Sequence, residues 1–240
     1  MIEFNIGDEI AKVVVRRAYR LDFETVYKLL DNKPFILAGG SLCGDPVNDF
    51  DLYPDSTNPY SMAAVRESID AHRDKVKFLS STRNAITVKL VDEDQVVQFC
   101  SYRKPTLFDL VKSFDFSHIQ VGIRFTGDGE PPHADAEYHT QEFVLANVAR
   151  RTAYTGSEYP LSSLVRLFKY AKRDKLTRVG VAQAAMKIMK DVLVRGYENY
   201  DDFKSQLDAV DLSVPDLREA WELYKTCCDK GLVASAKKEN

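Results

Sequence analysis

The 240-residue sequence lacks several features that would place it in a specialised class of protein. Its four cysteines show no CxxC spacing, and no apolar run approaches the length needed to cross a membrane. The N-terminus has neither the basic stretch nor the long apolar stretch of a signal peptide. There is no internal repeat and no low-complexity tract. These absences predict a cytoplasmic protein with reduced thiols and no membrane partner.

An excess of charge of one sign is also lacking. The chain has 33 Lys and Arg against 36 Asp and Glu, a net charge of −3, so any contact with nucleic acid requires a local basic patch. Two histidines, His133 and His139, have no partners at metal-ligand spacing. With 45% hydrophobic residues, the chain is long enough for one large or two small globular domains.

A glycine turn follows the first short apolar run. The sequence PFILA over 34–38 reads as a buried strand that runs into Gly39, Gly40 and Ser41. Glycines let a backbone approach a bulky anion and present its N–H groups to it. The Ser41 hydroxyl can donate to a phosphate oxygen. This turn is therefore a candidate site for a phosphate group.

Two carboxylates lie on the next apolar run, with seven residues between Ser41 and Asp49. In an extended strand, Asp49 and Asp51 share one face with Tyr53, while Phe50 and Leu52 share the other. The apolar pair can anchor the strand in the core, and Pro54 is expected to end it. Two carboxylates this close favour a cation between them, and Mg²⁺ binds carboxylates together with phosphate oxygens. A paired-metal site can activate an attacking hydroxyl and stabilise a leaving pyrophosphate.

The GGS turn, the seven-residue spacing and the DFD strand resemble the signature of the DNA polymerase β-like nucleotidyltransferase superfamily. The resemblance implies that Gly39, Gly40 and Ser41 bind a nucleoside triphosphate. It also implies that Asp49 and Asp51 bind two Mg²⁺ or Mn²⁺ ions. The wider pattern covers roughly the first 175 residues.

Apolar periodicity predicts a mixed α/β half followed by a helical half. Strands are expected at 36–41, 49–53, 76–80, 85–91, 95–102 and 116–125. Helices are expected over 8–31 (with Asp22 as an N-cap inside this stretch), 60–74, 106–113, 136–154, 161–174, 178–194 and in shorter pieces over 200–230. The Gly- and Pro-containing loop 126–135 suggests a catalytic α/β core over 1–130 and a helical domain over 131–240. The expected fold is α+β: a nucleotidyltransferase-type mixed sheet flanked by helices, then an all-helical C-terminal region.

Members of the superfamily have a third catalytic carboxylate, and two positions in this sequence are candidates for it. The adjacent strand, VVQFC, presents Gln98 where the family has an acid, and Gln is a poor Mg²⁺ ligand that cannot act as a base. The VQF run and the later FDF segment resemble a branch known largely from viral and phage genomes. In that branch the FDF aspartate, here Asp115, is the third acid and metal ligand. The alternative is that Asp115 is an N-cap or turn residue.

A basic helix follows in the second half. Residues 160–173 place Leu161, Leu164, Val165, Phe168 and Ala171 on one stripe. Arg166, Lys169 and Arg173 recur at three and four residues, on another face. The segment resembles the helix after the catalytic core of template-independent nucleotidyltransferases, which implies that Arg166 and Lys169 bind phosphate and that Tyr170 stacks on the base. The alternative is a solvated basic face.

Together these features predict a metal-dependent enzyme that transfers a nucleoside monophosphate from an NTP to a hydroxyl and releases pyrophosphate. An RNA 3′ end such as that of tRNA is the preferred acceptor; a second nucleotide, a protein hydroxyl or a small molecule are the others. Gln98 keeps a different hypothesis open, that of a catalytically silent nucleotide- or RNA-binding module. A third is a scaffold protein in which GGS is only a tight turn. The sequence does not indicate the oligomeric state.

Overall fold

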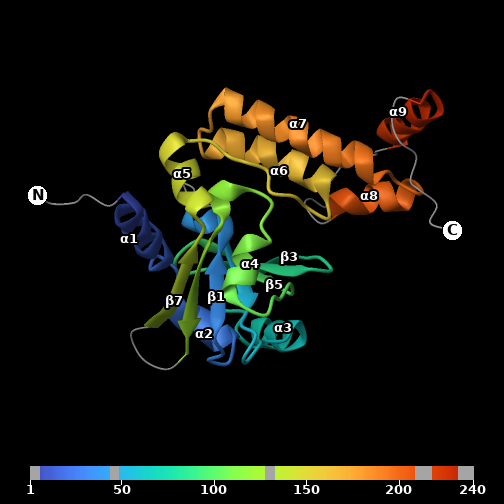
Figure 1. Cartoon of the computed structure of the whole chain (residues 1–240). Coiled ribbons are helices and arrows are strands. Elements are labelled where there is room, and N and C mark those ends of the chain that lie inside the picture. Colours follow the sequence, from blue (N-terminus) through green and yellow to red (C-terminus); the bar gives the residue numbers. More distant parts are fainter. Residues whose placement is uncertain (1–5, 44–48, 128–132, 209–217, 232–240) are drawn as a thin grey trace, which may run out of the picture. The chain divides into compact units, whose positions relative to one another are not determined.

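The structure is a computed structural model that describes residues 6–43, 49–127, 133–208 and 218–231. The chain divides into two compact units, Met1–Arg150 and Arg151–Asn240. The first unit contains a sheet with helices, and the second is helical in its described part (Figure 1). The predicted α+β fold, a mixed sheet flanked by helices and followed by C-terminal helices, is confirmed.

Seven strands form one sheet in the described part of the first unit, in the order β3-β4-β5-β2-β1-β6-β7. Their bounds are β1 Phe35–Ala38, β2 Phe50–Pro54, β3 Val76–Ser81, β4 Ala85–Leu90, β5 Gln95–Cys100, β6 Val121–Thr126 and β7 His133–His139. The β2 and β5 strands pair in parallel, and the other neighbours pair antiparallel. The strand that carries Asp51 therefore lies inside the sheet, hydrogen-bonded on both sides.

Helices cover both faces of this sheet. They are α1 Ile6–Ala18, α2 Phe23–Leu29, α3 Met62–Ala71, α4 Leu107–Lys112 and α5 Gln141–Ala149, with short 3₁₀ turns η1 Gly39–Leu42 and η2 Ser117–Ile119. Asp22 caps α2 by accepting from the Thr25 amide, as the sequence predicted. The main core joins α1, α2 and α3 to one face of the sheet through Phe35, Leu52 and neighbouring buried side chains.

On the opposite face, α4 lies close to the sheet. Leu110 packs there with Ile36 and Ala38. Gly122 on β6 allows this approach, because a β-carbon at this position would lie 2.9 Å from Leu107 Cδ1 and 3.2 Å from the Ala38 β-carbon. The chain that follows α4, including Asp115, is thereby held beside the sheet.

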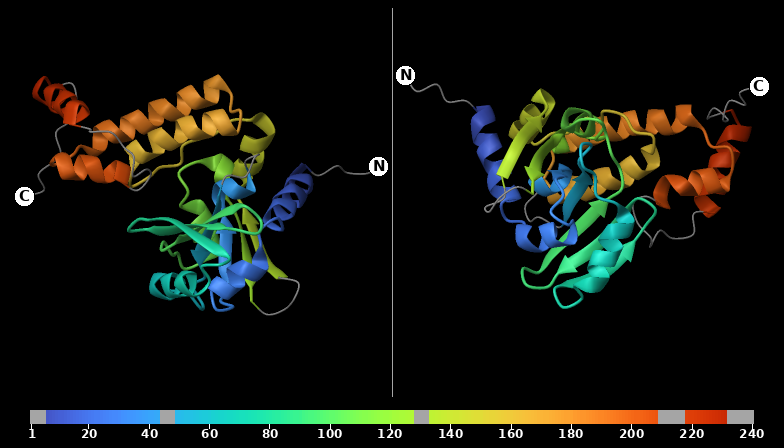
Figure 2. Two further views of the ribbon diagram at one scale, coloured as in Figure 1. Left: turned by 180° about the vertical axis from the view of Figure 1, so that it is seen from behind. Right: turned by 90° about the horizontal axis from the view of Figure 1, so that it is seen from below.

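The second unit contains α6 Pro160–Arg173, α7 Arg178–Arg195, α8 Tyr200–Asp208 and α9 Arg218–Asp229. Pro160 occupies the first turn of α6, as predicted. The long helices α6 and α7 pack side by side (Figures 1 and 2). The smaller α8 contacts both α6 and α9, and the Ser162 hydroxyl on α6 donates to the Gln206 carbonyl on α8.

Two predicted elements near the end of the first unit differ in part from the structure. The helix expected over 136–154 is instead β7 followed by α5, which Thr140 caps by accepting from the Phe143 amide. The strand expected over 116–125 starts later, because η2 precedes β6. The suggested domain boundary near residue 130 differs from the observed division after Arg150, since β7 pairs with β6 and α5 packs on η2.

Candidate active site

The first strand of the site ends in a glycine turn, as the sequence predicted. All four residues of β1 are buried, and η1 begins directly after them. Gly39 has φ +82°, in the left-handed region that side chains rarely adopt. The chain can therefore leave β1 abruptly and place Gly40 and Ser41 at the strand end.

Ser41 carries a buried hydroxyl. The residue is 2% exposed, and within the described part of the chain its Oγ has no hydrogen-bond partner. Burying a hydroxyl without a partner costs free energy, so such groups are uncommon in folded proteins. A phosphate oxygen bound at this turn would supply the missing acceptor.

Arg17 holds the end of the turn and was not identified from the sequence. From α1, its guanidinium donates to the carbonyl oxygens of Leu42 at 3.1 Å and Cys43 at 2.5 Å. The Cys43 thiol also donates to the Gly39 carbonyl at 3.2 Å. These bonds join the two ends of η1 to each other and to α1, so Arg17 is a positioning residue for the turn. The sequence could not predict this role, because Arg17 is 25 and 26 residues from the two carbonyl groups that it contacts.

The β2 strand separates its apolar from its polar side chains as predicted. Phe50 and Leu52 are buried in the main core, while Asp51 and Tyr53 on the opposite face are half-buried. Asp49 is half-buried directly before the strand. Tyr60 fixes β2 to β5, because its hydroxyl lies 2.6 Å from the Leu52 carbonyl and 2.9 Å from the Cys100 carbonyl.

A row of polar side chains crosses the sheet beside Asp51. Parallel pairing places Asp51 opposite Gln98 on β5, and antiparallel pairing places Gln98 opposite Thr87 on β4. The Gln98 amide donates to the Thr87 hydroxyl at 3.1 Å. The position next to Asp51 is therefore a neutral amide oriented by a neighbouring strand.

The buried thiol of Cys100 at the end of β5 lies within the electrostatic influence of both aspartates. Burial raises the pKa of this thiol well above its usual value, and the carboxylates of Asp51 and Asp49 raise it further, while a hydrogen bond with Tyr53 lowers it. Both carboxylates thus act on one buried atom at the end of β5. The structure brings Asp49, Asp51, Tyr53 and Cys100 together on one side of the sheet.

Asp115 lies in the segment between α4 and η2 and is 5% exposed. Its neighbour Phe114 packs against Tyr53, with ring centroids 5.8 Å apart, and its ring lies 3.8 Å from where a Gly39 β-carbon would be. The η2 turn contacts η1. Asp115 caps neither adjacent helix, since Thr106 caps α4 and Phe116 precedes η2. Its predicted role as the third acid stays a prediction.

The donor set fits a magnesium–nucleotide complex better than a metal cage made by the protein alone. No three His, Cys, Asp or Glu side chains among the described residues are grouped as metal ligands. Asp49 and Asp51 supply two carboxylates, and Ser41 supplies a buried hydroxyl nearby in the same unit. Mg²⁺ commonly takes one or two carboxylates and completes its shell with water and substrate phosphates.

The three predicted phosphate- and base-binding residues of the second unit lie on α6. Lys169 is exposed, and Arg166 and Tyr170 are half-buried. Arg173 was expected to extend this row, but it pairs with both carboxylate oxygens of Asp174, at 2.6 and 2.8 Å, and its guanidinium stacks on Tyr170. Its charge is therefore already balanced within the helix end.

The apolar stripe predicted on α6 does not form the buried face of this helix. Phe168 is 61% exposed and Val165 is 46% exposed, whereas Leu167 is fully buried. Ser162 and Ser163 are buried with it. The buried face of α6 is therefore the one with Ser162, Ser163 and Leu167, and the spacing of large apolar residues did not predict it.

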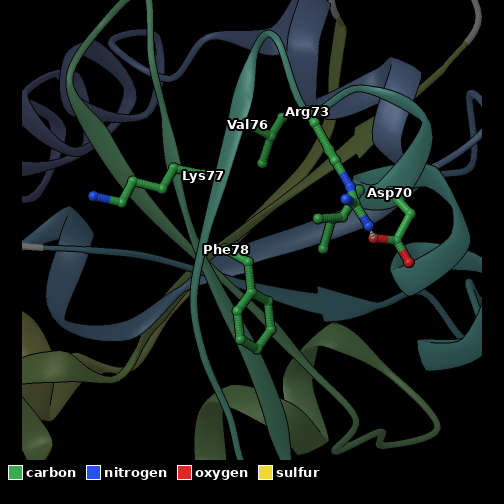
Figure 3. A pocket seen from close by; sticks show the side chains of 6 residues that line it. Asp70, Arg73, Val76, Lys77 and Phe78 are labelled. Carbon is green, nitrogen blue, oxygen red and sulfur yellow. Dashed lines mark hydrogen bonds and ion pairs between the residues drawn. The ribbon is translucent and has the colours of Figure 1, made fainter.

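A cavity of about 580 Å³ lies elsewhere in the first unit, between α3 and β3 (Figure 3). Its lining is Ile69, Asp70, Arg73, Val76, Lys77 and Phe78. Arg73 donates to Asp70 at 2.6 Å. The β3 strand is the sheet edge, and β4 and β5 separate it from β2. None of the predicted site residues lines this cavity.

No family model and no curated protein matches the sequence. Among solved structures, the chain is similar to a Thermotoga maritima CCA-adding enzyme complexed with tRNA, with 13% identity and a TM-score of 0.46 over 91% of this chain and 54% of that one. A tRNA-processing enzyme with CTP gives 14% identity and a TM-score of 0.45, over 71% and 46%. The chain thus spans about half the length of these structures. In the residues the structure describes, no helix is both long and apolar enough to span a membrane.

Proposed function

We propose that the protein is a metal-dependent nucleotidyltransferase. It transfers a nucleoside monophosphate from an NTP to a hydroxyl acceptor, with release of pyrophosphate. The observation that supports this most is the pairing of a glycine turn, whose buried Ser41 hydroxyl has no partner among the described residues, with two carboxylates: Asp51 on the adjacent strand and Asp49 directly before it.

Each group has a distinct role in this proposal. Gly39 and Gly40 allow the triphosphate to approach the backbone at the end of β1, and the Ser41 hydroxyl donates to a phosphate oxygen. Asp49 and Asp51 hold Mg²⁺ or Mn²⁺, which supplies activation of the attacking hydroxyl and neutralises charge on the leaving pyrophosphate. Arg17 keeps the turn in place through the Leu42 and Cys43 carbonyls.

Asp115 is the proposed third acid, and it acts on the side of the attacking hydroxyl. Its support is its burial next to Phe114, which touches both the glycine turn and the β2 face. Gln98 stands in register with Asp51 and supplies only an amide there. A silent nucleotide-binding module is therefore the second candidate, and Gln98 is the specific observation in its favour.

An RNA 3′ end, such as that of tRNA, is the acceptor we propose within this class. The α6 helix, Pro160–Arg173, contains four Lys and Arg and no Asp or Glu, a local excess of positive charge in a chain whose net charge is −3. Exposed Lys169 and half-buried Arg166 and Tyr170 lie within this segment. Phosphate contacts of this kind depend strongly on salt, so RNA transfer should weaken as salt concentration rises.

The test is transfer of label from each of four α-labelled NTPs to short RNAs, with Mg²⁺ or Mn²⁺. Asp49→Asn and Asp51→Asn should each lower transfer by about 100-fold or more, as loss of a group that stabilises transition-state charge does. Binding of NTP without transfer under all acceptors tried would favour the silent module. Absence of any NTP-dependent rise in melting temperature would overturn both candidates.

A further inference from the structure

The α7 helix is apolar on two opposite faces. On one face Gly180, Ala184 and Ile188 are buried, and α7 packs on α6. On the other, Val179 is 58% exposed, Met186 65% and Met189 53%. An apolar face of a helix is normally buried against another element. The second apolar face of α7 is exposed although the helix already packs on α6 through its first, so it requires an explanation.

The exposed apolar residues follow one regular spacing. Val179, Ala182, Met186, Met189 and Leu193 are separated by three, four, three and four residues. All five are exposed. This is the a/d spacing of a heptad repeat, which places the side chains in a single seam along the helix. We call these five residues the α7 seam.

Scattered exposed apolar residues are normal, but a contiguous row along one helix is typical of a protein interaction surface. A helix is the partner whose own a/d residues match this geometry, because knobs of one helix fill holes on the other. The seam spans two heptads, which gives a partner helix several anchoring positions.

The charged residues beside the α7 seam indicate which charge a partner should carry. Arg178, Lys187 and Lys190 are exposed on α7, and none of its exposed positions carries a carboxylate. The single carboxylate of α7, Asp191, is half-buried, so a second copy of this helix would bring the same three exposed cations against one half-buried acid. The seam also contains no aromatic residue on which unstacked bases could lie, which disfavours a single-stranded nucleic acid.

We propose that the α7 seam binds an amphipathic helix of a partner protein whose flanking positions are acidic. The partner's apolar residues cover the seam, and its carboxylates face Lys190 and Arg178. None of the seam residues belongs to the proposed nucleotidyl-transfer site.

Two synthetic heptad-repeat peptides test the proposal directly by fluorescence anisotropy with the full chain. Both have Leu at a and d; one has Glu at e and g and the other has Lys. The Glu peptide should bind at least about 10-fold more tightly than the Lys peptide, because complementary charge governs helix pairing. Met186→Glu and Met189→Glu should each abolish binding of the Glu peptide.

Lys190→Glu should reverse or remove the preference between the two peptides. Lys175→Glu changes an exposed cation outside α7 and serves as the matched control, with no change expected. Circular dichroism and melting temperature confirm that each variant is folded, and because the changed side chains are exposed, both should match the unaltered protein.

Four results would overturn the proposal. The first is that the Glu peptide does not bind to the folded chain. The second is binding that Met186→Glu leaves unchanged. The third is a dimer in sedimentation that Met186→Glu dissociates, which would assign the seam to a second copy. The fourth is displacement of the bound peptide by a single-stranded RNA oligonucleotide, which would assign the surface to nucleic acid.

Discussion

Asp51 on β2 stands directly opposite Gln98 on β5 in a parallel strand pair, with the amide of Gln98 turned toward Thr87. The carboxylate that the proposed reaction most depends on therefore has a neutral neighbour. Because a carboxylate at position 98 would repel Asp51 in the absence of a cation, the amide favours stability of the chain without metal.

Replacing Gln98 by Glu tests what this neutral neighbour does. The Gln98→Glu variant should melt at a lower temperature than the unaltered chain without Mg²⁺, because two carboxylates then face each other. It should gain more stability on addition of Mg²⁺, since the ion would relieve this repulsion. Thermal melting across a Mg²⁺ titration measures both effects.

Thr87→Val is the control for this change, because it removes the Gln98 hydrogen bond without adding charge. Its melting temperature should show no added dependence on Mg²⁺. An equal Mg²⁺ response in the Gln98→Glu and unaltered proteins would show that no cation binds beside Asp51, against the proposed role of this strand.

Ser41→Ala should separate stability from ligand binding. Removing a buried hydroxyl that has no partner among the described residues should leave the protein as stable or more stable, by up to about 1 kcal/mol. The same change should weaken NTP binding, because the proposed donor to phosphate is lost. Urea unfolding gives the first quantity, and the NTP-dependent shift in melting temperature gives the second.

If Ser41→Ala lowers stability by about 1 kcal/mol or more while NTP binding is unchanged, the hydroxyl has a structural role and the phosphate site lies elsewhere. Ser117→Ala is a useful comparison, because Ser117 is also a 2% exposed serine of a short 3₁₀ turn.

Arg17→Met should loosen the glycine turn. The variant loses the bonds from the guanidinium to the Leu42 and Cys43 carbonyls, and bonds from a charged group contribute about 1.5–3 kcal/mol each at most. We expect a lower free energy of unfolding and a higher KM for NTP. Arg16→Met changes an exposed neighbour on the same helix and should alter neither quantity.

The stability of the protein should fall as pH rises above about 9. Burial raises the pKa of the Cys100 thiol well above its ordinary 9.0 and that of the Tyr60 hydroxyl well above 10.0, with further contributions from nearby Asp51. The unfolded chain releases these protons first, so the folded state binds more protons and its stability declines with pH, by at most about 1.4 kcal/mol per pH unit per group.

Urea unfolding at a series of pH values between about 8 and 10.5 measures this decline. The Cys100→Ala variant should show a shallower decline than the unaltered protein, since one of the two raised groups is gone. Identical slopes would mean that Cys100 titrates normally in the folded chain.

The sequence predicted the glycine turn and the alternation of β2 because both depend on local rules. The φ of Gly39 and the opposite burial of Phe50 and Asp51 follow from residue type and strand period. Residues 136–139 of β7 were predicted as the start of a helix, because Ala136 and Glu137 favour helix locally, and 133–135 were predicted as loop. Pairing with β6 decided otherwise, as tertiary context often does for strands.

Contacts between residues far apart in the sequence could not be predicted, because they depend on tertiary packing. The role of Arg17 depends on how α1 meets η1. On α6, burial of Ser162, Ser163 and Leu167 instead of Phe168 depends on which neighbouring helices approach and from where. Periodicity of apolar residues finds a helix, but it does not find the buried face when that face contains serines.

The parallel pairing of β2 with β5 has a consequence for how the site forms during folding. The β3, β4 and β5 strands form a local antiparallel series, each next to its neighbour in sequence. The β2 strand can join β5 only after the intervening chain closes a large loop, and contacts of that kind form more slowly than local ones. Asp51 therefore reaches Gln98 only after β2 has joined β5, and a partly folded chain that keeps only β3, β4 and β5 lacks the proposed nucleotide site.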